Sequence, residues 1–126
     1  MNSSETFAKR VFFWAAVYGI VMLAPQYFLE GQLGRDFPPP ITHPEHFYGF
    51  IGLALAWQFA FLAIARQPTR LRPVMLAAVL EKFSFAASSF ALLAAARAPL
   101  PLGIFAAIDV LLGTLFLLAY RRLADT

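Results

Sequence analysis

The sequence predicts an all-α fold, an antiparallel four-helix transmembrane bundle that forms one domain over residues 1–126. Two features of the composition support it. Hydrophobic residues make up 60% of the chain and charged residues 13%, whereas soluble domains average about half and about a quarter. The hydrophobic residues also gather into four long stretches. A helix that crosses a bilayer needs about 20 mostly apolar residues, and each stretch meets that need: residues 7–29, 47–65, 73–96 and 100–120.

The first stretch, residues 7–29, is too long for the core of a signal peptide, and no small-residue cleavage pattern follows it. We therefore expect it to be retained as a membrane helix. Pro25 is expected to kink the outer part of this helix, because proline lacks the backbone N–H and clashes with the preceding turn.

The connection to the second stretch, residues 30–41, is expected to be a loop that is stiff and extended in part. Its three consecutive prolines, residues 38–40, favour a polyproline conformation. Thr42 and Glu45 then have the spacing of a capping box, which predicts the start of the second helix. Pro44 would lie in the first turn, where its missing N–H costs least.

The third and fourth stretches are joined only by residues 97–101, so we expect these two helices to pack side by side. The link between the second and third stretches, residues 66–72, is also short. Short links make consecutive helices antiparallel neighbours.

The positive charges predict an orientation with both termini in the cytoplasm. Seven of the ten Lys and Arg residues would then be cytoplasmic and two would be outside, while Lys82 lies within a span. A Lys/Arg bias of this kind in short loops sets membrane orientation. Together with the excess of arginine and alanine, it predicts a multi-pass protein of a bacterial inner membrane. The basic residues lie at helix ends rather than in one patch, so we expect no nucleic-acid partner.

Three charged residues lie deep inside the predicted spans, near the middle of the bilayer. Glu81 and Lys82 follow Arg72 by nine and ten residues, which places them about 14–15 Å into a hydrocarbon core of about 30 Å. Asp109 lies at a depth of about 18 Å from the same side. A charge at the bilayer centre costs on the order of 2.5–3.5 kcal/mol, so we expect these side chains to face the other helices and find partners.

Matching depths predict those partners. Lys82 and Asp109 are expected to form a buried ion pair between the third and fourth helices. Gln58 and Tyr18, both at a depth of about 12 Å, are expected to reach Glu81. Two serines extend the Glu81 face of the third helix. The predicted ligand-binding set is Glu81, Gln58, Tyr18, Lys82, Asp109, Ser84 and Ser88.

The sequence contains no catalytic signature, and without cysteine it has no disulfide framework and no Cys nucleophile. We expect no cofactor and interpret the polar set as a pocket for a small hydrophobic or lipid-like molecule. Alternatively, the same residues serve only to hold the helices together, and the protein is an accessory subunit or scaffold of a membrane complex. Two further functions fit the buried charges: a proton-coupled carrier that acts as an oligomer, and a membrane isomerase that uses Glu81. Membrane lipids and further copies of the chain are the expected partners.

His43, Glu45 and His46 cluster at the predicted start of the second helix, and the two histidines share a helix face. These residue types can bind a metal ion. Helix capping and interfacial solvation explain the same residues, so we expect no metal.

A resemblance to known proteins is carried by residues 43–50, Trp57–Gln58, Leu80–Lys82 and Ile108–Asp109. In these segments the chain resembles small uncharacterised bacterial integral membrane proteins with four helices. The resemblance implies the four-span fold and no particular activity. The chain differs from small multidrug transporters, whose essential carboxylate lies in the first helix, because residues 7–29 have no carboxylate at their centre.

Overall fold

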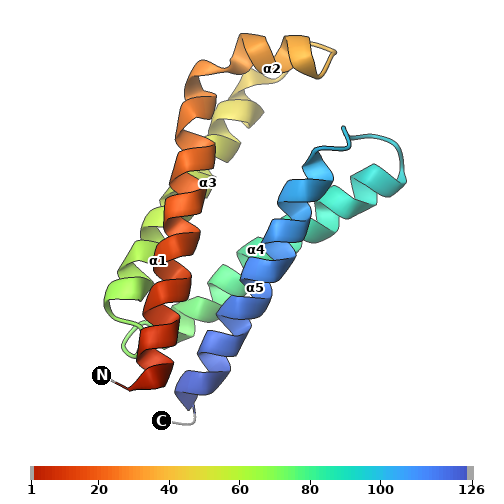
Figure 1. Ribbon diagram of the computed structural model, residues 1–126. Helices are drawn as coiled ribbons and strands as arrows, with labels where there is room; N and C mark the ends of the chain where they lie inside the picture. Colours follow the sequence, from red (N-terminus) through yellow and green to blue (C-terminus); the bar gives the residue numbers. More distant parts are fainter. Residues whose placement is uncertain (1, 125–126) are drawn as a thin grey trace.

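The computed structural model describes residues 2–124, and the secondary structure of that part of the chain consists of helices, without strands (Figure 1). Four of its helices are long and apolar enough to cross a membrane. Two shorter helical segments follow the first of them. In chain order the elements are α1 (Ser3–Leu23), the 3₁₀ helix η1 (Ala24–Phe28), α2 (Glu30–Asp36), α3 (Pro44–Arg66), α4 (Arg72–Ala94) and α5 (Leu102–Ala124).

Helix α1 begins earlier than the apolar pattern predicts. The side chain of Asn2 caps the helix by accepting a hydrogen bond of 2.8 Å from the backbone N–H of Glu5. A cap of this kind satisfies a backbone donor that has no partner inside the helix. At its other end α1 gives way to η1 at Ala24, directly before Pro25. Pro25 therefore changes the type of helix at the expected position, because it cannot donate the next α-helical hydrogen bond.

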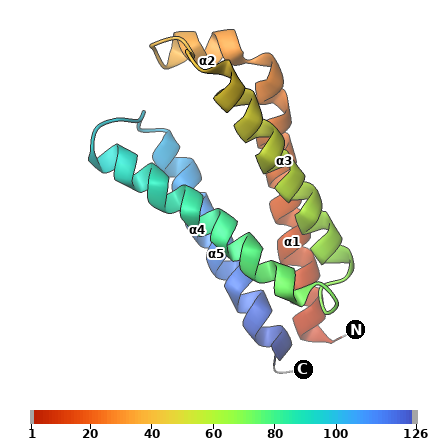
Figure 2. The same cartoon turned by 180° about the vertical axis from the view of Figure 1, so that it is seen from behind.

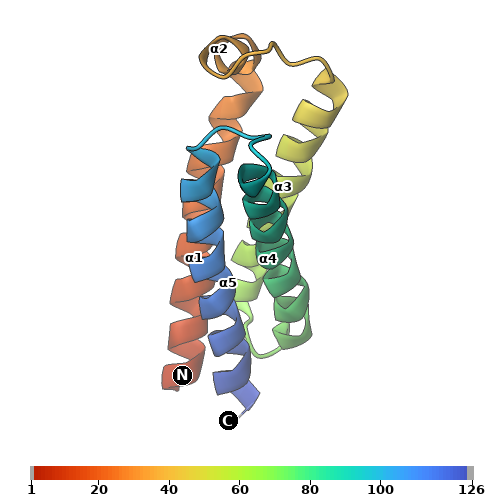
Figure 3. The same cartoon turned by 90° about the vertical axis from the view of Figure 1, so that its right-hand side faces the viewer.

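The expected loop at residues 30–41 contains a fifth α-helix, so this part of the prediction is wrong. Helix α2 lies across the end of the molecule that is remote from both termini (Figures 1 and 3). Within it the amide of Gln32 donates to Asp36 at 2.8 Å, and Arg35 donates to Gln32 at 3.0 Å. The prolines after Asp36 end this helix rather than prevent it, since proline is excluded only from helix interiors.

The predicted capping box at the start of α3 is also wrong. His43, not Thr42, occupies the capping position, and no side chain caps the helix there. The carboxylate of Glu45 instead lies 3.4 Å from Nδ1 of His43. Pro44 does lie in the first turn, as predicted.

Each long helix runs opposite to the one before it, and the four form two pairs, α1 with α3 and α4 with α5 (Figures 1 and 2). The pairs meet where α1 packs on α5, near the two termini, and they diverge towards α2. The end of the molecule at which the pairs meet, near the two termini, is called the closed end. Helices α3 and α4 are joined by a short loop at the closed end and have little further contact. The molecule thus consists of two antiparallel helix pairs that are in contact at one end and separate towards the other, rather than four helices packed together along their whole length.

The hydrophobic core occupies the closed end. Three buried phenylalanines from three helices form its centre: Phe12 stacks on Phe116 with ring centroids 4.1 Å apart, and Phe61 lies edge-on to Phe116 at 5.0 Å. Small residues such as Ala16 and Ala119 let the helices approach around these rings. The charged residues in the middle of α4 and α5 lie directly beyond this aromatic centre.

Candidate functional site

Three charged side chains meet at the middle of the α4–α5 pair. The ammonium Nζ of Lys82 lies 3.4 Å from Oδ1 of Asp109 and 3.7 Å from Oε2 of Glu81. The side chains are 5%, 11% and 19% exposed, respectively. The predicted ion pair between Lys82 and Asp109 is therefore confirmed, and Glu81 joins the same ammonium from the neighbouring position on α4.

Close approach of the two helices makes this contact possible. Gly113 lies four residues after Asp109 on the same face of α5, and it faces α4. A Cβ atom at Gly113 would lie 3.1 Å from Cβ of Lys82 and 3.1 Å from the ring of Phe83. A larger residue would push α4 away, so the missing side chain brings the Lys82 stem within reach of Asp109.

The aromatic core closes one side of the charged cluster. Nζ of Lys82 lies 5.3 Å from the centre of the Phe61 ring, which α3 contributes. An ammonium over an aromatic face is attracted by the ring electrons, and more strongly where water is excluded. Phe61 is a site residue that sequence reasoning missed. The available signal was its spacing, because Phe61 lies on the same face of α3 as Gln58, one turn later.

Glu81 has the least satisfied polar group of the cluster. Its Oε2 is buried and accepts no hydrogen bond within the described residues, since 3.7 Å to Lys82 is an ion-pair distance and too long for a hydrogen bond. Buried polar atoms almost always have a partner. No donor among the described residues fills the acceptor position of this oxygen.

Gln58 does not reach Glu81, and this part of the prediction is wrong. The side chain is 1% exposed, and its Nε2 donates to the backbone oxygen of Ala54 at 2.8 Å. Its Oε1 packs tightly against Gly19 of α1 and accepts no hydrogen bond in the described structure. The cause is the pairing of the helices, because α3 packs along α1 and turns Gln58 towards that neighbour.

The remaining predicted residues make no hydrogen bond or ion pair with the charged groups of the cluster. Tyr18 on α1 is half-buried. Ser84 and Ser88 are exposed on α4, and the Ser84 hydroxyl donates to the backbone oxygen of Glu81 at 3.2 Å. The structure therefore brings Lys82, Asp109 and Glu81 together and places the two serines on the outer surface.

At the far end of the molecule, His43, Glu45 and His46 approach one another as their spacing suggested. One ligand atom from each lies within 4.8 Å of the others, and the two imidazole rings are 5.2 Å apart. All three residues are exposed. These are the described residues that could together hold a metal ion, although their ion pair and ring stacking also account for the arrangement.

The buried cluster combines one ammonium group with two carboxylates. Counted by formal charges, one ammonium faces two carboxylates, which leaves one surplus negative charge, and one carboxylate oxygen accepts no hydrogen bond within the described residues. No protein-family model, no curated protein and no solved structure matches this chain. The arrangement of the side chains is thus the basis for a functional assignment.

Proposed function

We propose that this chain is an integral protein of a bacterial inner membrane that binds a small hydrophobic or lipid-like molecule at the Glu81–Lys82–Asp109 cluster. In this proposal its four long helices form an antiparallel transmembrane bundle. The observation that carries the proposal is the buried, unbonded Oε2 of Glu81 beside an ammonium that two carboxylates share.

The surfaces of the long helices support a membrane location. Large apolar side chains are exposed on the described helices, among them Leu53 on α3, Leu80 on α4 and Ile104 on α5. Soluble monomers rarely expose extensive apolar surface, whereas lipid tails solvate such side chains without cost. The four helices also have the length and composition that a bilayer requires.

The distribution of cations supports both termini in the cytoplasm. The closed end carries seven of the ten Lys and Arg residues, at the start of α1, around the α3–α4 loop and at the end of α5. Positive loops remain on the cytoplasmic side during insertion. The charged cluster would then lie near the middle of the membrane, with α2 on the outer surface.

The chemistry of the cluster supports a particular class of ligand. An unbonded acceptor with surplus negative charge favours a ligand that carries a hydroxyl or an ammonium donor. The surrounding residues are apolar and aromatic, so the rest of the ligand should be apolar. A hydrophobic amine or alcohol satisfies both requirements.

A scaffold is the second candidate, and one observation favours it. The Lys82–Asp109 pair joins α4 directly to α5, so it would hold these helices together without any ligand. A polar contact within a membrane contributes about 0.6 kcal/mol on average. In a scaffold the unbonded oxygen of Glu81 would have no role.

Glu81→Gln separates the two candidates. The variant keeps the size of the side chain and one carbonyl acceptor but removes the negative charge. We expect hydrophobic amines and alcohols to raise the melting temperature of the wild type in detergent and to leave that of Glu81→Gln unchanged. Glu5→Gln, which removes a carboxylate near the start of α1, is the matched control and should respond like the wild type. If every compound shifts Glu81→Gln as much as the wild type, or none shifts the wild type, the scaffold is the better description.

A further inference from the structure

A second candidate site lies on the surface between α1 and α3, at the closed end of the molecule and away from the charged cluster. It is a groove of about 670 Å³, within the range of about 300–1,000 Å³ that is usual for ligand sites. Its lining combines three cations with apolar and aromatic residues: Lys9, Arg10, Phe13, Trp14, Leu62, Ala65 and Arg66.

The three cations of this groove have no partner among the described residues. Lys9, Arg10 and Arg66 make no ion pair, hydrogen bond or ring contact there. Two other arginines at the same end are engaged: Arg72 donates to the backbone oxygen of Tyr120 at 2.9 Å, and Arg122 lies 4.6 Å from the centre of the Phe7 ring. Arg70 and Arg121 at this end also lack such a contact but do not line the groove, so three of the five cations there without a partner among the described residues lie in it.

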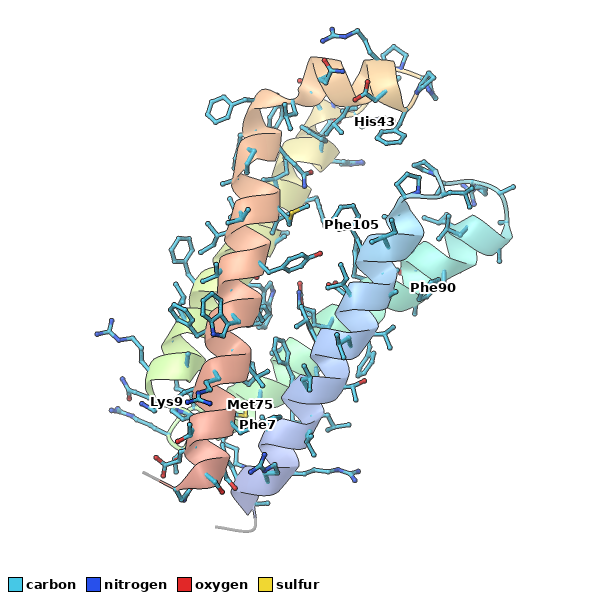
Figure 4. All side chains as sticks on the ribbon, viewed as in Figure 1. Phe7, Lys9, His43, Met75, Phe90 and Phe105 are labelled. Carbon is cyan, nitrogen blue, oxygen red and sulfur yellow. The ribbon has the colours of Figure 1, made fainter. Side chains whose placement is uncertain are left out.

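The lining is arranged as an amphiphile requires. Arg10 on α1 is followed one turn later by Phe13 and Trp14, and Arg66 on α3 is preceded one turn earlier by Leu62. Because α1 and α3 run in opposite directions (Figure 1), both helices place cations at the end of the groove nearest the chain termini, where Figure 4 labels Lys9, and apolar residues further in. Phe13 and Trp14 are 43% and 63% exposed, so their rings are available for contact.

We propose that this groove binds an anionic phospholipid, whose phosphate sits among the three cations and whose acyl chain lies along the apolar residues. Charge complementarity selects an anionic headgroup, and basic pockets between membrane helices on the cytoplasmic side bind such headgroups. The apolar part of the groove distinguishes the lipid from a free phosphate ion. Lipid binding here requires membrane insertion and is independent of any ligand at Glu81.

Trp14 provides a local probe of the groove. The chain has two tryptophans, so Trp57→Phe leaves Trp14 alone. The protein is purified in a neutral detergent, and quenching of Trp14 is titrated with phosphatidylglycerol and with phosphatidylcholine that carry identical brominated acyl chains. We expect phosphatidylglycerol to quench at the lower mole fraction.

Three variants in the Trp57→Phe background complete the experiment. Arg10→Gln and Arg66→Gln each remove one groove cation, and each should reduce the preference for phosphatidylglycerol about fivefold, the effect of one cation near an anionic lipid. Arg70→Gln removes an exposed cation of the neighbouring loop that does not line the groove, and it should leave the preference unchanged. Since the two groove arginines lie on different helices, a folding defect in one variant leaves the other as the test.

Equal quenching by the two lipids would overturn the proposal, and so would an equal loss of preference in Arg70→Gln. Inorganic phosphate, added at constant ionic strength, should leave the quenching by phosphatidylglycerol unchanged. If it displaces the lipid completely, the site takes free phosphate and the lipid assignment is wrong. Loss of amine or alcohol binding in Glu81→Gln with intact lipid preference would support the two sites as separate.

Discussion

The ammonium of Lys82 and the carboxylate of Asp109 lie 3.4 Å apart across the interface between α4 and α5. Both residues are buried, near the centre of their helices. The contact joins the helix pair at the level where the aromatic core ends. It is also the polar contact between α4 and α5 that the matching depths of the two residues in the predicted spans indicated.

Breaking this pair should destabilise the protein. Lys82→Met leaves the Asp109 carboxylate buried without its counter-charge, so we expect a loss of about 3 kcal/mol, the scale of an unpaired charge at the centre of a membrane. Unfolding of the purified protein in mixed detergent and denaturant measures this free energy. The exchanged double variant, Lys82→Asp with Asp109→Lys, should recover part of the loss. A double variant no more stable than Lys82→Asp alone would show that the pair contributes little.

Close packing at Gly113 should be as important as the pair itself. Gly113→Ala places a methyl group 3.1 Å from Cβ of Lys82 and from the Phe83 ring, so these side chains must shift by a few tenths of an ångström. Overpacking of this kind costs about 1–3 kcal/mol. Gly49→Ala on α3 is the matched control, because a Cβ atom there meets nothing within 4 Å. Thermal melts should show a lower melting temperature for Gly113→Ala and an unchanged or higher one for Gly49→Ala. The opposite order would contradict the close contact.

The proposed orientation can be tested with reporter fusions. A cytoplasmically active reporter placed after residue 124, or in the loop at residues 67–71, should be active. A periplasmic reporter should be active only in the connections at residues 37–43 and 95–101. The physical reason is the retention of seven of the ten cations on one side. Periplasmic activity in the 67–71 loop would falsify the orientation.

The sequence determined the four long helices because their formation depends on local composition. In a membrane helix all backbone hydrogen bonds form within the same segment. Each apolar stretch can therefore be identified as a helix without knowing which other helices it packs against. Helix ends were less predictable. Asn2 caps α1 before the apolar stretch starts, and α2 forms in a segment whose prolines suggested an extended loop. Both features depend on a few polar contacts, which leave no periodic pattern in the sequence from which they could be predicted.

The Lys82–Asp109 pair could also be predicted from the sequence. Charges inside an apolar span must find partners, and a short link between two helices leaves few choices of partner at equal depth. The tertiary structure decided where Gln58 turns. Its depth matched that of Glu81, but the pairing of α3 with α1 directs the amide to Gly19. Depth along a helix follows from residue counting, whereas the direction of a side chain around the helix depends on which neighbour packs there. Packing between distant segments therefore decided which polar residues share a site.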